Sequence, residues 1–170
     1  FFHQTGVFFH VWPNDIDFNF HLTNSRYLSV MDLGRTDLLI RTGLAKQLWS
    51  LKWKPVLGGA TIRFRRSLTV GQRYGLWTQI VGWDDKWLYI EQQLKHNDTI
   101  IARAMVKAIF VDGKRSIPTA VLFQTFGIVA DPVSLTPAVT AFTHMDKLVQ
   151  RCCTAVVRTA ESVFSRLGMG

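Results

Sequence analysis

The chain has 170 residues, of which 48% are hydrophobic and 19% charged, and this composition is typical of one compact domain and excludes a largely disordered chain. No apolar run of about 18 residues is present, so the sequence predicts no membrane-spanning helix. We find no secretory leader pattern, and the adjacent Cys152 and Cys153 offer no disulfide framework, so we expect a cytoplasmic protein. The net charge of +8 favours an anionic partner, although a charge of this size also serves solubility alone.

The first quarter of the chain predicts a strand, a loop and a long helix. Residues 5–12 are rich in Val, Phe and Trp and predict a strand, and residues 13–24 predict an irregular loop. From 25 to about 41, apolar residues recur at helical spacing, and Gly43 suits the C-terminal end of this helix. Gly34 costs the helix about 1 kcal/mol relative to Ala, and close packing on another backbone is a reason to accept that cost.

The middle of the chain predicts an antiparallel sheet. After a polar and aromatic connection at 47–54, hydrophobicity alternates with a period of two, and turn residues separate successive segments. The predicted strands cover residues 60–65, 73–83, 86–96 and 99–111. One face of the last strand is rich in Ala, which leaves room for a helix to pack closely. We therefore predict an α+β fold in which one long helix lies against the sheet.

The C-terminal part predicts a helical extension. Residues 118–130 are ambiguous between a short helix and a loop, whereas 136–167 predict a helix with Thr136 as its cap. We accordingly divide the chain into a domain at 1–130 and an extension at 131–170. The extension carries a basic side formed by Lys147, Arg151, Arg158 and Arg166. Such a helix covers a sheet face or a dimer seam, or it contacts a membrane surface peripherally.

Residues 12–32 hold the candidate chemistry. Asp15 and Asp17 lie in the loop before the long helix, whose first amides, around Asn24 to Arg26, are unsatisfied and carry the positive end of the helix dipole. This arrangement suits acyl transfer, because the amides can hold an oxyanion while Asp17 attacks the carbonyl or deprotonates a water. The alternative is that Asp15 or Asp17 only caps a turn.

The same residues resemble a known motif. Hotdog-fold acyl-CoA thioesterases of the 4-hydroxybenzoyl-CoA thioesterase type share a pattern that is matched here by Asp15, Asp17, His21, Asn24 and Tyr27. Phe20 and Thr23 stand where the family pattern has Gly and Asn. The resemblance extends from about residue 5 to 127, and segments 59–67 and 81–86 look like the thioesterase-superfamily-member-6 branch.

The resemblance implies a hotdog fold, in which a curved antiparallel sheet wraps around one central helix, and a homodimer or dimer of dimers. It places Asp17 at the position of the catalytic carboxylate and the amide near Asn24 at the group that polarises the thioester carbonyl. Asp32 would line the acyl pocket, and Tyr27 would contact substrate. His21 is a candidate acid or base, as in the hotdog dehydratases, or a loop residue that fixes the turn.

The function we predict is hydrolysis of an acyl-CoA thioester, with coenzyme A as part of the substrate and no separate cofactor. The phosphates of coenzyme A would contact a basic set formed by Arg63, Arg65, Arg66 and Arg103. No His or Cys pair has metal-ligand spacing, and no nucleic-acid-binding signature is present. The alternative function is a non-catalytic hotdog module that binds acyl-CoA, lipid or a protein partner.

Overall fold

The computed structural model describes residues 3–129 and 135–166, with side chains described up to residue 151. The chain divides into two compact units, residues 1–135 and 136–170. The predicted domain boundary at 130/131 and the predicted helix end at Leu167 lie outside the described residues, as do the side chains of Cys152, Cys153, Arg158 and Arg166. Within the described part of the chain, no helix is both long and apolar enough to cross a membrane.

The first unit is built on one antiparallel sheet in the order β1-β3-β4-β5-β2, with β6 also paired to β5. The strands are β1 Thr5–His10, β2 Lys54–Phe64, β3 Arg73–Trp83, β4 Leu88–His96, β5 Thr99–Asp112 and β6 Arg115–Ile117. Asn97 and Asp98 both have positive φ in the tight turn between β4 and β5, a conformation that these residue types tolerate. The predicted hairpins at 73–111 are confirmed.

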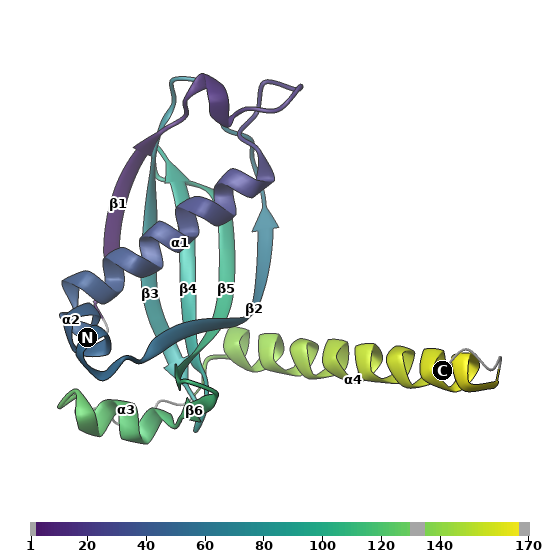
Figure 1. Ribbon diagram of the computed structural model, residues 1–170. Helices are drawn as coiled ribbons and strands as arrows, with labels where there is room; N and C mark the ends of the chain where they lie inside the picture. The colour runs from purple at the N-terminus through teal and green to yellow at the C-terminus, as the bar shows by residue number, and fades with distance from the viewer. Residues whose placement is uncertain (1–2, 130–134, 167–170) are drawn as a thin grey trace. The chain divides into compact units, whose positions relative to one another are not determined.

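Helix α1, Asn24–Arg41, runs across one face of the curved sheet (Figure 1). Its buried side carries Tyr27, Val30, Met31 and Leu38, which pack on the apolar inner face of the strands. Gly34 is the point of closest approach, because a Cβ built there would stand 2.3 Å from Leu76 Cδ2 and 2.7 Å from Thr78 Oγ1. Gly34 therefore packs closely as predicted, but on side chains of the sheet and not on another backbone. The predicted α+β hotdog arrangement of one long helix on a curved antiparallel sheet is confirmed.

The structure adds elements that the sequence pattern did not predict. Helix α2, Leu44–Leu51, replaces the first half of the expected connection, and β2 begins at Lys54 and continues through a bulge near Gly58. Strand β2 was predicted to be half-buried, but it is a sheet edge and most of its residues are exposed. Helix α3, Thr119–Thr125, packs with α2 on a second apolar cluster that includes Leu48, Phe110 and Phe123.

The second unit is described as one helix, α4 Pro137–Arg166. Thr136 Oγ1 accepts a hydrogen bond from the Val139 amide at 3.4 Å, so Thr136 is the predicted cap and Pro137 is the first helical residue.

Candidate functional site

The segment before α1 forms a small hairpin. The Asp17 amide donates to the His21 carbonyl at 2.8 Å, and the Thr23 amide donates to the Asp15 carbonyl at 2.9 Å. Ile16 and Leu22 pair between them as an antiparallel bridge. In this register Asp15 stands opposite the residue that caps α1, whereas Asp17 stands two residues further toward the hairpin tip. Asp15 is thus the nearer of the two carboxylates to the cap of α1 along the hairpin, and the role of Asp17 stays a prediction.

The Asp17 carboxylate organises the tip of the hairpin. Its Oδ1 accepts hydrogen bonds from the amides of Asn19, at 2.8 Å, and His21, at 3.2 Å. Phe20 closes the turn with φ of 60°, which explains why glycine is common there in the resembling family. No hydrogen bond from the described residues reaches Asp17 Oδ2. Asp17 is thus an exposed turn cap with one oxygen still available.

Asp15 is a structural carboxylate. Its side chain is 5% exposed, pairs with Arg26 Nε at 3.0 Å and accepts the Trp12 amide at 3.2 Å. The ion pair joins the hairpin to the first turn of α1, where a negative charge also complements the helix dipole.

The start of α1 retains open donors. Thr23 Oγ1 accepts the Arg26 amide at 3.3 Å, and the Thr23 carbonyl accepts the Arg26 and Tyr27 amides. Among the described residues, no acceptor reaches the amides of Asn24 and Ser25. These two N–H groups are the ones available to hold a developing negative charge.

Tyr27 is a buried core residue and is not part of the cavity wall. Its side chain is 3% exposed and packs edge-on against Phe64, with ring centroids 5.1 Å apart. Burial raises the pKa of Tyr27 from 10.0 to about 12. The neighbouring Tyr74 phenol is likewise buried, and desolvation raises its pKa to about 12.

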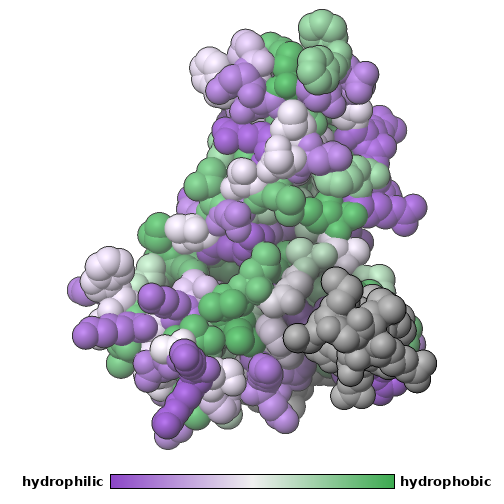
Figure 2. Space-filling model, turned by 45° about the vertical axis from the view of Figure 1, so that its right-hand side comes forward, coloured by the Kyte–Doolittle hydropathy of each residue, from purple (hydrophilic) through white to green (hydrophobic). Residues whose placement is uncertain are grey.

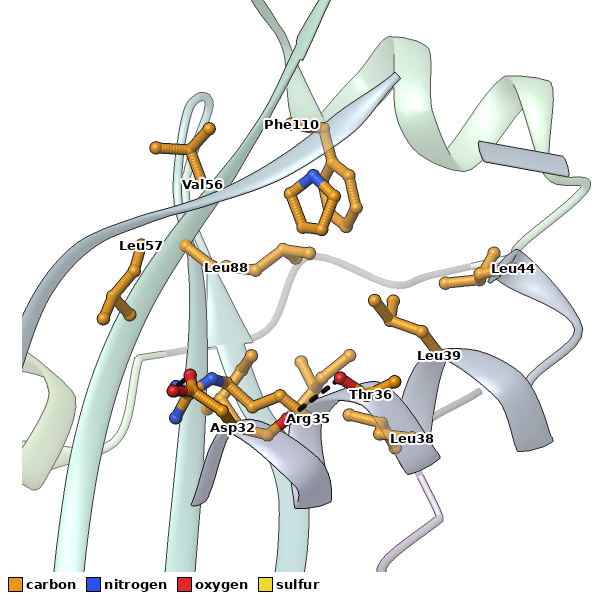
Figure 3. A pocket seen from close by; sticks show the side chains of 14 residues that line it. Asp32, Arg35, Thr36, Leu38, Leu39, Leu44, Val56, Leu57, Leu88 and Phe110 are labelled. Carbon is orange, nitrogen blue, oxygen red and sulfur yellow. Dashed lines mark hydrogen bonds and ion pairs between the residues drawn. The ribbon is translucent and has the colours of Figure 1, made fainter. Parts of the chain in front are cut away.

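A cavity of about 190 Å³ lies between the C-terminal half of α1 and the inner face of the sheet (Figure 3). Its wall is mostly apolar and comes from α1, α2, β2, β3, β4 and β5. The apolar lining residues are Leu38, Leu39, Leu44, Pro55, Val56, Leu57, Ile80, Leu88, Ile90, Ala108 and Phe110. Ala108 belongs to the Ala-rich face of β5, which was predicted to leave space for a closely packed helix. At Ala108 this space is part of the cavity and is not filled by helix α1.

The polar residues of this cavity, Asp32, Arg35 and Thr36, all lie on one stretch of α1. Asp32 is 70% exposed and marks the mouth, whereas Arg35 is 16% exposed and pairs with Asp32 Oδ1. Arg35 also donates to Gln92 Oε1 at 2.6 Å. Gln92 itself is fully buried, and its Nε2 donates to the Met31 carbonyl at 2.8 Å and to Thr78 Oγ1 at 3.1 Å. The mouth is therefore tied to the core of the sheet through a chain of hydrogen bonds.

The structure brings together some predicted site residues and separates others. Asp32 lines the cavity, but Asp17, His21 and Asn24 are not part of its wall.

The predicted basic set is spread over two places. Arg63 and Arg103 are cross-strand neighbours on the outer face of the sheet, where Arg103 pairs with Glu91. Arg65 and Arg66 follow the end of β2 as exposed residues. Arg63 and Arg103 thus lie on the side of the sheet that faces away from the cavity, and none of the four arginines is part of the cavity wall.

Arg35 and Gln92 are site residues that we did not predict. Gln92 interrupts an otherwise apolar series, because Leu88, Ile90 and Leu94 share its face of β4. A lone amide in such a series is the signal that would have indicated a buried polar contact. Among the described residues, no group of His, Cys, Asp or Glu has the geometry of a metal site.

Fold and site together define a hotdog-fold protein with an apolar cavity beside its central helix. The model of the thioesterase-like superfamily matches residues 11–157, and the chain belongs to this family. It is similar to protein THEM6 of Xenopus laevis, with 43% identity over 83 residues that cover 49% of this chain and 40% of that protein. It is also similar to a probable thioesterase of Saccharomyces cerevisiae, with 24% identity over 137 residues that cover 78% of this chain and 59% of that protein. The chain spans less than half the length of the THEM6 proteins it matches.

Solved structures share the fold. The probable thioesterase YbaW of Escherichia coli superimposes with a TM-score of 0.66 at 18% identity, covering 74% of this chain and 96% of that one. A Staphylococcus aureus protein in complex with CoA gives a TM-score of 0.65 at 17% identity, covering 79% of this chain and 89% of that one. At these identities the likeness establishes the hotdog fold.

Proposed function

We propose that this protein hydrolyses acyl-CoA thioesters to a free acid and CoA. The observation that carries the proposal is the apolar cavity with a charged mouth, set against the central helix in a member of the thioesterase-like superfamily. An acyl chain in this cavity leaves water, and its thioester then lies near the mouth at Asp32.

Asp17 is the proposed base or nucleophile, and the open amides of Asn24 and Ser25 are the proposed oxyanion donors. Asp17 Oδ1 is held by two amides, so Oδ2 remains for a water or a carbonyl carbon. His21 fixes the hairpin through its backbone, and its side chain is a further candidate for proton transfer.

A homodimer would complete this site. Asp17 lies outside the cavity wall of its own protomer, and β2 presents an unpaired sheet edge with exposed Val56, Leu57 and Phe64. Hydrophobic residues are visible among hydrophilic ones on the face that is turned forward in Figure 2. Pairing of two such edges covers these side chains and sets the hairpin of one protomer against the cavity mouth of its partner.

The test is Asp17→Asn, assayed by thiol release from a panel of acyl-CoAs. Because an Asn side-chain oxygen still accepts the amides of Asn19 and His21, the turn persists and the thermal midpoint stays within about 1–2 °C of the parent value. Hydrolysis should fall by about a thousandfold or more, since the charged oxygen is lost. Asp98→Asn, in the exposed turn after β4, is the matched control and should retain full activity. A folded Asp17→Asn protein with undiminished turnover would refute the role of Asp17.

The second candidate is an acyl-CoA-binding module without turnover. The exposed position of Asp17 and its use as a turn cap favour this reading. Saturable binding of acyl-CoA by the parent protein, with no thiol release under the same conditions, would identify the binder.

A further inference from the structure

We infer that the acyl group taken by this cavity carries a keto oxygen close to its thioester end. The inference rests on the proposed function and adds a substrate class to it. It starts from the polar group of a mostly apolar cavity wall, in which Arg35 supplies the cation beside Asp32 and Thr36.

Arg35 is held in place from two sides. One nitrogen donates to Gln92 Oε1 at 2.6 Å, and another pairs with Asp32 Oδ1. Gln92 cannot turn away, because its Nε2 is bonded to the Met31 carbonyl and Thr78 Oγ1 inside the core. The guanidinium is therefore a fixed feature of the wall and not a flexible surface group.

Donors remain on this guanidinium. It has five N–H groups, and the hydrogen bonds that the described residues make with it occupy one on each of two nitrogens. Arg35 keeps 16% of its side chain exposed, and it lines the cavity. These donors are hydrated while the cavity holds water.

The remaining donors distinguish between acyl chains. A saturated chain that fills the cavity displaces water from Arg35 and returns no acceptor, which costs free energy. A keto oxygen at the same place replaces the water as an acceptor. Because Arg35 keeps its bonds to Gln92 and Asp32 in either case, the discrimination should be about tenfold rather than several orders of magnitude.

The position of the oxygen along the chain follows from the position of Arg35. Asp32, its ion-pair partner, is 70% exposed at the mouth, whereas the apolar part of the wall includes the buried Leu44 and Phe110. The polar spot is thus near the entrance, where the carbons next to the thioester lie, and the rest of the chain meets apolar wall.

The experiment compares matched pairs of ligands, acetoacetyl-CoA with butyryl-CoA and 3-oxodecanoyl-CoA with decanoyl-CoA. Turnover is followed by thiol release, and binding is measured by calorimetry with thioether analogues in which a methylene replaces the thioester carbonyl. The binding measurement excludes the higher chemical reactivity of 3-oxo thioesters as a cause. We expect the oxo member of at least one pair to bind about tenfold more tightly.

Arg35→Met should reduce this ratio to about one, because the side chain keeps an unbranched apolar stem and loses its donors. The matched control is Arg41→Met on the same helix, where Arg41 pairs with Asp37 outside the cavity, and it should keep the parent ratio. Gln92→Leu should also lower the ratio, since Arg35 then loses its anchor. Equal binding of both members by the parent protein, or an unchanged ratio in Arg35→Met, would overturn the inference alone. Failure of every acyl-CoA and analogue to bind would overturn the proposed function and this inference with it.

Discussion

Replacement of Gly34 by Ala tests how closely the central helix packs on the sheet. At an exposed helical position this change stabilises a protein by about 1 kcal/mol, because Ala is the better helix former. Here the new methyl group would stand 2.3 Å from Leu76 Cδ2, 2.7 Å from Thr78 Oγ1 and 3.2 Å from Gln92 Nε2. All three neighbours are fully buried, so none can move into solvent.

Overpacking of this kind costs about 1–3 kcal/mol, and two contacts below 3.0 Å favour the upper part of that range. The propensity gain of about 1 kcal/mol offsets only part of the cost. We therefore expect a net loss of about 1–2 kcal/mol in the free energy of unfolding, or a thermal midpoint lower by about 2–8 °C for a chain of this size.

Urea denaturation of the parent, Gly34→Ala and the exposed control Ser29→Ala would measure this loss. A second measurement places Gly34→Ala in a Leu76→Val background, where the shorter side chain relieves the nearest contact, and there the cost should shrink by about half or more. If Gly34→Ala raised stability as Ser29→Ala is expected to, the close approach of helix and sheet would be wrong.

Two further predictions concern the core and the sheet edge. Burial raises the pKa of Tyr27 and Tyr74 from 10.0 to about 12, so both phenols stay neutral in the folded protein at pH values where the unfolded chain already ionises them. The free energy of unfolding that they contribute is therefore fully present below pH 10 and is lost as the pH rises toward 12. Tyr27→Phe should move alkaline unfolding, followed by absorbance at the tyrosinate band, to higher pH, and an unchanged transition would contradict the raised pKa. Thr61 is exposed on the β2 edge, and Thr61→Lys tests whether two such edges pair in a dimer. If they pair, the variant should shift toward monomer, because like charges then meet across the two-fold axis. An unaltered mass in light scattering would argue against edge pairing.

Local patterns determined most of the sheet and the central helix of this protein. The period-two segments from Arg73 to Val111 lie in consecutive hairpins whose turns are set by their own residues, so neighbouring sequence contains the relevant information. Helix α1 was predicted to within one residue, because its cap and its apolar spacing are both local. The weakest prediction was β2, where Pro55, Gly58 and Gly59 lower strand propensity and pairing with β5 decides the conformation.

Tertiary structure decided the site. Two carboxylates two residues apart look alike in the sequence, and only the register of the hairpin shows that Asp15 is buried against Arg26 while Asp17 caps an exposed turn. The cavity depends on side chains from residue 32 to residue 110, and its charged mouth depends on an amide 57 residues from Arg35 in sequence. Such contacts leave no periodic trace in the sequence, because they follow from where the folded strands place each side chain relative to the helix.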